Sequence, residues 1–287
     1  MPEAAYHLVH PAARTTSVVF ASPHSGRDYP AAFLRRSVLN HHEIRSSEDA
    51  FVDRLFEVAP QVGAPFLRAG MPRAFVDLNR SAEELDPALV EGVPRGGHNP
   101  RVASGLGVIP RVVANGRAIY AGKIDRAEAA WRIDTFWRPY HRALQQQLDH
   151  AAGRFGQSIL IDCHSMPHEA MDSVARRGGK RPEVVLGDRF GAAAAPEIVD
   201  GIEAAFADAG LVVTRNTPFA GAYITQHYGR PTRNRHAIQV EIDRALYMDE
   251  RRIRPGAGFE AFRTLLGSVI AGIADIGRVV DGSLAAE

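Results

Sequence analysis

Short apolar segments alternate with amphipathic helical segments along this chain, and several of the apolar segments end directly at polar residues. The β-branched run at 17–21 stops at a Ser-Pro pair and is followed at once by His24, and the run at 157–161 leads into Asp162 and His164. Strands that alternate with helices are typical of a mostly parallel sheet covered by helices on both faces. Such sheets hold their sites at the carboxyl ends of the strands, where these polar residues fall.

We therefore predict an α/β sandwich with a mostly parallel sheet, formed by a single catalytic domain that spans residues 1–287. Pro139 is expected to kink the longest helix. Residues 81–118 are rich in Gly, Pro and Arg without periodicity, so we expect a functional loop that borders the active site. The predicted strands are 17–21, 66–67, 74–78, 157–161, 184–186, 211–214 and 237–242, and the predicted helices are 49–58, 125–153, 196–209 and 258–276.

Composition narrows the classes of partner. The formal net charge of +1 selects no polyanion, so nucleic acid is not expected as a partner. The single cysteine, Cys163, excludes an internal disulfide and a multi-cysteine zinc module. No apolar run is long enough to span a membrane, and no signal-like segment opens the chain, so we expect a cytoplasmic protein without a membrane partner. The oligomeric state does not follow from the sequence.

Two strand-end motifs share one form, in which a histidine among small or polar residues follows an apolar strand. They are SVVFASPHSG around His24 and SILIDCHSMP around His164. A catalytic zinc site uses about three His or carboxylate ligands and leaves one position open for water. Each histidine taken singly is explained equally well as a polar residue that ends a strand, whereas the two together favour a metal site.

A third ligand is expected from the acidic segment SSED at 46–49. Glu48 and Asp49 both lie at the start of a predicted helix, and the sequence leaves the choice between them open. Acids in a first helical turn also oppose the positive end of the helix dipole, so an N-cap formed with the two preceding serines explains the same pattern. Asp162 is a candidate to accept a hydrogen bond from the imidazole of His164 and fix its tautomer.

The strand AIQVEID at 237–243 holds Glu241, the candidate general base. Metal-assisted amide hydrolysis needs a base that takes a proton from water and returns it to the leaving amine. Strand alternation points Glu241 the same way as Gln239 and Asp243, and a half-buried carboxylate there needs a partner. An exposed strand face that carries these three polar residues is the alternative.

Basic residues near another strand end suit an acidic substrate. Asn79 and Arg80 lie just past a predicted strand, and Arg73 lies upstream of them. A guanidinium grips a carboxylate through two parallel hydrogen bonds, although ordinary surface arginine explains any single one. The segment GAYITQHYG at 221–229 adds His227, a candidate catalytic residue on a flexible loop that closes over a ligand.

The ordered set of motifs resembles the N-formylglutamate amidohydrolases. Each motif alone is weak, but together they run in order over most of the chain. The likeness is carried by PHSG at 23–26, EDAFVDRLF at 48–56, DLNR at 77–80, PYH at 139–141, DCHSMP at 162–167, LGDRFG at 186–191, GAYITQHYG at 221–229 and QVEIDRALYM at 239–248.

The resemblance implies a zinc-carboxypeptidase-like fold, with a mixed sheet between helical layers in a three-layer sandwich. It implies hydrolysis of N-formyl-L-glutamate to formate and L-glutamate, a late step of histidine degradation, with one Zn²⁺ ion as the cofactor. By position it makes His24, Asp49 and His164 the metal ligands, Glu241 the general base, and Asn79 and Arg80 the clamp for the substrate α-carboxylate. Arg73 and His227 are expected to stabilise charge or close the pocket.

Two positions depart from related patterns. Arg27 in HSGR stands where metallocarboxypeptidases carry their acidic ligand, and Ala50 follows Asp49 where family members of histidine degradation tend to have Trp. The preferred acyl group and amino acid therefore stay open. The alternatives are a deacylase or carboxypeptidase-like hydrolase of a larger N-acyl or peptide substrate, and a non-catalytic binder of acidic amino acid derivatives. Several divalent ions suit two histidines and a carboxylate, so the metal is also open.

Overall fold

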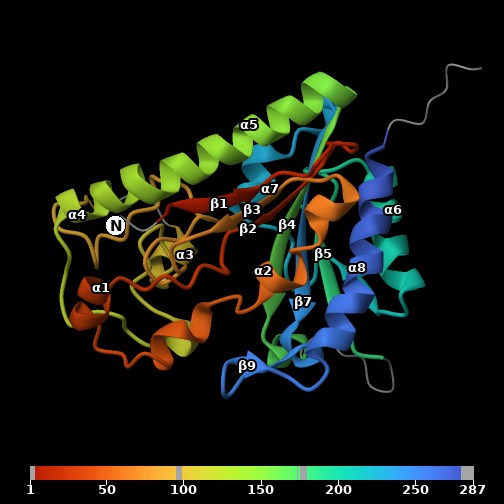
Figure 1. Cartoon of the computed structure of the whole chain (residues 1–287). Coiled ribbons are helices and arrows are strands. Elements are labelled where there is room, and N and C mark those ends of the chain that lie inside the picture. Colours follow the sequence, from red (N-terminus) through yellow and green to blue (C-terminus); the bar gives the residue numbers. More distant parts are fainter. Residues whose placement is uncertain (1–3, 95–98, 173, 175–179, 279–287) are drawn as a thin grey trace, which may run out of the picture.

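A seven-stranded sheet forms the centre of the molecule, as Figure 1 shows. The computed structural model describes residues 4–94, 99–172, 174 and 180–278. The strands lie in the order β1-β3-β2-β4-β7-β5-β6. Every residue of β2 and β4 is buried, because both faces of the sheet are covered. The strands are β1 (Tyr6–Val9), β2 (Val18–Ser22), β3 (Phe66–Ala69), β4 (Ser158–Met166), β5 (Val184–Gly187), β6 (Val213–Arg215) and β7 (Arg235–Asp243), with a separate two-stranded ribbon of β8 (Met248–Asp249) and β9 (Arg254–Pro255).

The sheet is mixed and mostly parallel, as predicted. Strands β3, β2, β4 and β7 run parallel to one another, whereas β1 is antiparallel to β3 and β5 is antiparallel to β7. The carboxyl ends of the four parallel strands therefore meet at one edge, where α/β sheets hold their sites. The short edge strand β1 was not predicted from the sequence, because its four residues, YHLV, are too few to show a clear alternation of apolar and polar positions.

Helices cover both faces of the sheet in three layers, which confirms the predicted sandwich. In Figure 1, α4 and α5 lie on one face, and α2, α6 and α8 lie on the other. Each face has its own apolar cluster: Leu160 belongs to the cluster that contains Leu144 of α5, and Ile161, its neighbour in β4, belongs to the cluster that contains Ile270 of α8. The helices are α1 (Ala31–Arg36), α2 (Val52–Leu55), α3 (Pro100–Ala103), α4 (Arg126–Arg132), α5 (Arg138–Phe155), α6 (Pro196–Asp208), α7 (Tyr223–Tyr228) and α8 (Phe259–Ile276).

The long predicted helix is interrupted just before Pro139. A π-helical turn at Ile133–Trp137 separates α4 from α5, and Pro139 lies in the first turn of α5. Proline has no N–H to donate to the preceding turn, so the regular α-helical ladder cannot pass through it. A π turn thus interrupts the helix at this point, whereas the kink at Pro139 itself stays a prediction.

Two local predictions are wrong. Residues 74–78 form turns and extended chain outside the sheet, because the chain bends after Pro72 and the Asp77 N–H donates to the Val108 carbonyl (2.8 Å). The predicted helix 49–58 is reduced to the short α2, because Phe51 has a left-handed backbone with φ of 67° at its start. The two serines close a 3₁₀ turn at Glu43–Ser47, so they do not cap α2.

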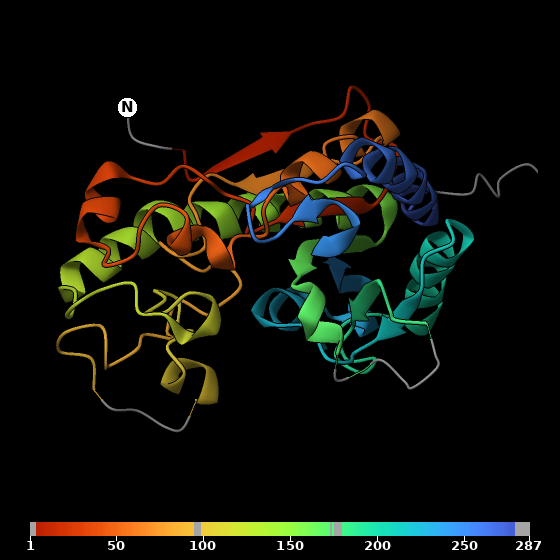
Figure 2. The ribbon, with the colours of Figure 1, turned by 90° about the horizontal axis from the view of Figure 1, so that it is seen from below.

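The predicted irregular segment at 81–118 is confirmed in its described part. Figure 2 shows this segment and residues 27–47 gathered beside the sheet, away from α6 and α8. In its described residues, 81–94 and 99–118, only α3 and a 3₁₀ turn at Ala114–Gly116 interrupt it with helix. No described helix is both long and apolar enough to cross a membrane.

Candidate active site

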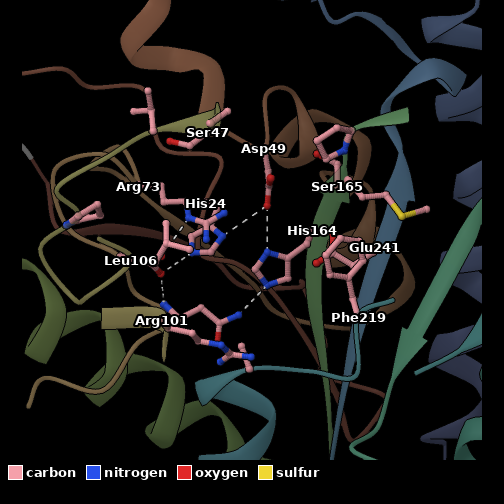
Figure 3. Close-up of a pocket in the computed structure, with 18 of the residues that line it drawn as sticks. His24, Ser47, Asp49, Arg73, Arg101, Leu106, His164, Ser165, Phe219 and Glu241 are labelled. Atoms are coloured by element: carbon pink, nitrogen blue, oxygen red, sulfur yellow. Dashed lines mark hydrogen bonds and ion pairs between the residues drawn. The ribbon is translucent and has the colours of Figure 1, made fainter. Parts of the chain in front are cut away.

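His24 lies two residues beyond β2, at the carboxyl edge of the sheet, and Figure 3 shows it turned toward His164 and Asp49. Its Nε2 lies 2.7 Å from Oδ1 of Asp77. Its Nδ1 is buried, has no hydrogen-bond partner in the described part of the chain, and lies 3.6 Å from Oδ2 of Asp49. Gly26 makes this exit from β2 possible, because a Cβ there would lie 2.1 Å from the Met71 carbonyl oxygen.

His164 lies inside β4, on the same face as Asp162. Its Nε2 lies 3.0 Å from Oδ1 of Asp162, and its Nδ1 lies 3.0 Å from Oδ2 of Asp49. Both imidazoles therefore have one nitrogen beside a carboxylate and turn the other toward the same oxygen of Asp49. A carboxylate behind a ligand imidazole fixes its tautomer and raises its basicity, as in many metal sites.

The residues at this point fit a divalent cation. His24, Asp49 and His164 each offer one ligand atom, and these three atoms lie within 4.8 Å of one another. Burial lowers the pKa of His164, but the carboxylates of Asp162 and Asp49 raise it well above the usual range. This cluster attracts positive charge, and Nδ1 of His24 has no hydrogen-bond partner among the residues that the structure describes. The cluster therefore has the donor set of a metal site. That an ion binds these three residues stays a prediction.

Asp49 and Glu48 point in different directions, although they are adjacent in sequence. Glu48 pairs with Arg45 (2.8 Å) and accepts from the Tyr29 hydroxyl (3.2 Å), away from the histidines. The second oxygen of Asp49, Oδ1, accepts from Nη2 of Arg244 (3.0 Å). Burial raises the pKa of Asp49, but hydrogen bonds and charge from the two histidines hold it well below its usual range. Geometry thus selects Asp49 for the cluster.

Glu241 lies beside His164, because parallel pairing of β4 with β7 makes these two residues register partners. Its side chain is buried and accepts from Nε2 of Gln239 (2.8 Å), which confirms that both residues occupy one strand face. The alternative of an exposed polar face is wrong. Burial raises the pKa of Glu241 to about 7, and the nearby charge of Asp49 acts in the same direction. A carboxyl group with a pKa near neutrality suits proton transfer.

A cavity of about 600 Å³ opens above this cluster. Its floor contains His24, Asp49, His164 and Glu241, and one wall is formed by residues 101–116 of the irregular segment. The prediction that this segment borders the site is confirmed. A cavity of this size holds a small molecule.

The predicted substrate residues Arg73, Asn79 and Arg80 all line the cavity. Nε of Arg73 donates to Oδ2 of Asp77 (3.0 Å), so this arginine also steadies the partner of His24. The Asn79 side chain is engaged by the protein, because its Oδ1 accepts from the Ile224 N–H (2.8 Å) and its Nδ2 lies 3.2 Å from Nε2 of His164. Asn79 therefore ties α7 to the cluster.

His227 does not reach the cavity, contrary to its predicted role. The segment at 221–229 contains the helix α7, which packs on β7 and β4, so it is no irregular closing loop. Helical geometry turns His227 outward, where it is exposed and stacks on Tyr223 with ring centroids 5.1 Å apart. Only the beginning of this segment, at Gly221 and Ala222, lines the cavity.

Sequence reasoning gave no role in the site to four side chains that line the cavity: Asp77, Arg101, Arg244 and Gln239, which it had placed only on the strand face of Glu241. Arg244 had a usable signal, since it follows β7 directly at the edge where the other polar residues lie. Its Nε donates to Ser165 Oγ (3.1 Å) and its Nη2 to the Glu48 carbonyl (3.0 Å), so it joins β4 to the acidic segment. Arg101 had no signal, because only the fold of the irregular segment brings it to the cavity.

The sequence matches the N-formylglutamate amidohydrolase family over residues 16–248. An N-formylglutamate deformylase of Pseudomonas aeruginosa is 30% identical over 242 residues, which cover 82% of this chain and 83% of the relative. An N-formylglutamate deformylase of Pseudomonas putida is 29% identical over 240 residues, which cover 81% of this chain and 82% of the relative.

A solved structure agrees with the sequence comparison. The crystal structure of N-formylglutamate amidohydrolase from Ralstonia eutropha matches with a TM-score of 0.88 and 34% identity, over 95% of this chain and 98% of the other. The further likeness to metallocarboxypeptidases stays a prediction. The resemblance that the ordered motifs carried is confirmed, and the chain belongs to the N-formylglutamate amidohydrolase family.

Proposed function

We propose that this protein is a metal-dependent amidohydrolase that converts N-formyl-L-glutamate and water to formate and L-glutamate in the cytoplasm, as a step of histidine degradation. The observation that carries the proposal is the meeting of three potential ligand atoms and a buried carboxyl group on the floor of one arginine-lined cavity. The names of the relatives support the substrate.

His24, Asp49 and His164 would hold the ion, and zinc suits two imidazoles and one carboxylate. When bound, such an ion polarises a carbonyl oxygen and makes water more acidic. Asp77 and Asp162 orient the two imidazoles from behind. Each of these contacts lies in the buried floor of the cavity, where water competes least.

Glu241 is the proposed general base and acid. It removes a proton from the attacking water while the water oxygen joins the formyl carbon. As the carbon–nitrogen bond breaks, Glu241 returns that proton to the nitrogen of glutamate. Its raised pKa, about 7, makes it able both to accept and to release the proton near neutral pH. Gln239 holds the carboxyl group in place from the same strand face.

The substrate α-carboxylate is assigned to Arg73 and Arg80. Arg80 is buried and is fixed by its own donors, Nε to the Leu106 carbonyl (2.9 Å) and Nη1 to the Asn79 carbonyl (2.8 Å). A guanidinium held in this way is oriented before the ligand arrives, which reduces the entropy lost on binding. Asn79 positions this arginine and α7 without needing a direct contact with the substrate.

A hydrolase of larger N-acyl amino acids is the rival within the same chemistry. A cavity of about 600 Å³ accepts ligands larger than a formylated amino acid. Replacing formyl by acetyl or succinyl on the same glutamate tests this point. A formyl-specific enzyme loses most of its rate on both analogues, whereas the rival keeps or gains rate.

Formate release from N-formyl-L-glutamate is the decisive measurement, made before and after chelation and after zinc is added back. We expect metal-dependent turnover that is abolished in His164→Ala. The matched control is His227→Ala, because that histidine is exposed and outside the cavity, and it should keep full activity. If the protein binds zinc but releases no formate, N-formyl-L-glutamate is not its substrate. If it binds N-formyl-L-glutamate tightly but neither holds zinc nor releases formate, it is a non-catalytic binder.

A further inference from the structure

Four arginines line the cavity, and they differ in how the protein holds them. Three donate to acceptors within the protein: Arg73 Nε to Asp77 (3.0 Å), Arg80 Nε to the Leu106 carbonyl (2.9 Å), and Arg244 Nη2 to Asp49 (3.0 Å). Arg101 differs, since its guanidinium has no carboxylate within 4.0 Å in the described ranges.

The backbone around Arg101 is nevertheless firmly held. Its N–H donates to the capping side chain of Asn99 (3.0 Å), and its carbonyl accepts from the Leu106 N–H (2.8 Å). The Leu106 carbonyl in turn accepts from Arg80. Leu106 therefore links the backbone of Arg101 to the side chain of Arg80 on one wall of the cavity. A cation on a fixed backbone, with its side chain left to solvent, is placed to receive a ligand.

The wall carries an excess of positive charge. Burial lowers the pKa of Arg80, and the neighbouring charges of Arg73 and Arg101 lower it further, against the opposing effects of Asp77 and of Glu84, whose Oε2 lies 3.9 Å from Nε of Arg80. Three arginines thus face two carboxylates here, which leaves a net positive charge. Like charges that crowd one cavity repel each other unless an anion enters. Two separate positive positions, Arg73 with Arg80 and then Arg101, match a ligand with two carboxylates.

We propose that Arg101 is the specificity-determining residue that binds the second carboxylate of a dicarboxylic N-acyl amino acid. This inference rests on the proposed function, since it assigns the side-chain carboxylate of the same substrate. The α-carboxylate binds Arg73 and Arg80 deep in the cavity, and the side-chain carboxylate binds Arg101 on the outer wall.

The matched substrates are N-formyl-L-glutamate and N-formyl-L-glutamine, which differ in one carboxylate that becomes a neutral amide. Arg101→Met should lower kcat/KM for the glutamate substrate roughly 10-fold. This loss is near the lower end of the range for a hydrogen bond between charged groups, because Arg101 is exposed to solvent. The loss should lie in KM, with kcat unchanged, since the side-chain carboxylate takes no part in breaking the amide bond. The glutamine substrate should change less than about twofold.

Two further variants separate charge from structure. Arg101→Lys keeps the charge without the planar fork, so it should recover part of the preference. Arg117→Met removes another arginine of the same segment that does not line the cavity, and it should leave both substrates unchanged. Equal losses on both substrates in Arg101→Met, or no loss on either, would overturn the assignment.

Binding distinguishes a failure of this inference from a failure of the proposed function. If the wild-type protein releases no formate, the proposed function fails. Calorimetric titration of the zinc-treated protein with N-formyl-L-glutamate and N-formyl-L-glutamine then tests Arg101 by itself. A wild-type preference for the glutamate ligand that is lost in Arg101→Met supports the assignment, and an unchanged preference refutes it.

Discussion

Replacing Asp77 by Asn tests how the protein prepares His24 for a metal ion. Oδ1 of Asp77 lies 2.7 Å from Nε2 of His24 and accepts from the Asn79 N–H (2.8 Å), while Oδ2 accepts from Arg73 (3.0 Å). An asparagine has one acceptor oxygen for these donors. If the amide NH₂ of the asparagine faces Nε2 of His24, Nε2 must accept a hydrogen bond. The ring proton then moves to Nδ1, the nitrogen that would bind the ion. If the amide NH₂ faces Arg73 instead, it lies against the N–H of Arg73, and two hydrogen-bond donors face each other without an acceptor.

Loss of such an outer partner typically weakens metal affinity 10- to 100-fold, or about 1.4 to 2.7 kcal/mol. We expect Asp77→Asn to fall in this range, because Asp77 is buried and water cannot replace the lost acceptor. Zinc affinity is measured by competition with a coloured chelator at constant pH. The same preparation is unfolded with urea, so that a change in folding stability is recorded separately.

Asp86→Asn is the matched control. Asp86 is also buried, and it likewise accepts from an arginine, Nε of Arg111 (2.7 Å), and from a backbone N–H, that of Ala88 (2.7 Å). It does not line the cavity. Both variants should lose folding stability, and only Asp77→Asn should lose zinc affinity. Equal zinc affinities in the two variants would refute the role assigned to Asp77.

Three further predictions follow from the site and the core. Glu241→Gln should lower kcat for formate release about 10² to 10⁴-fold and leave the affinity for zinc unchanged. An unchanged kcat would show that Glu241 is not the general base. Metal analysis should show that Asp49→Asn loses zinc and that Glu48→Gln retains it. The reverse result would mean that Glu48, and not Asp49, is the metal ligand. Burial lowers the pKa of His141 to about 3, so the unfolded chain takes up this proton first as the pH falls below about 6.5. The free energy of unfolding in urea should therefore fall by about 2 kcal/mol between pH 7.5 and 5 because of His141. The His141→Gln variant should lack this part of the pH dependence. An equal pH dependence in both proteins would contradict the prediction.

Much of the architecture was predictable from local sequence pattern. β-branched apolar runs predicted β2 and the central parts of β4 and β7, because strands that helices cover on both faces are mostly apolar. Polar residues directly after such runs indicated the edge where the site would lie. His24 and His164 could be singled out in this way, since a parallel sheet brings its strand ends together wherever the strands lie in sequence.

Local pattern failed where long-range contacts decide the backbone. Residues 74–78 have the alternation of a strand, yet the Asp77 N–H pairs with the Val108 carbonyl across the irregular segment. The segment at 221–229 has loop-like glycines at its ends, yet α7 forms because it packs on the sheet and its Ile224 N–H finds the Asn79 side chain.

The sequence by itself determined the α/β class, the edge of the sheet that carries the site, and the identity of most polar side chains there. The tertiary structure alone chose Asp49 over Glu48, because Arg45 holds one carboxylate and Arg244, remote in sequence, holds the other. It also set Glu241 beside His164, through the register of β4 with β7. Contacts between distant segments depend on how the whole chain packs, and no local spacing encodes them.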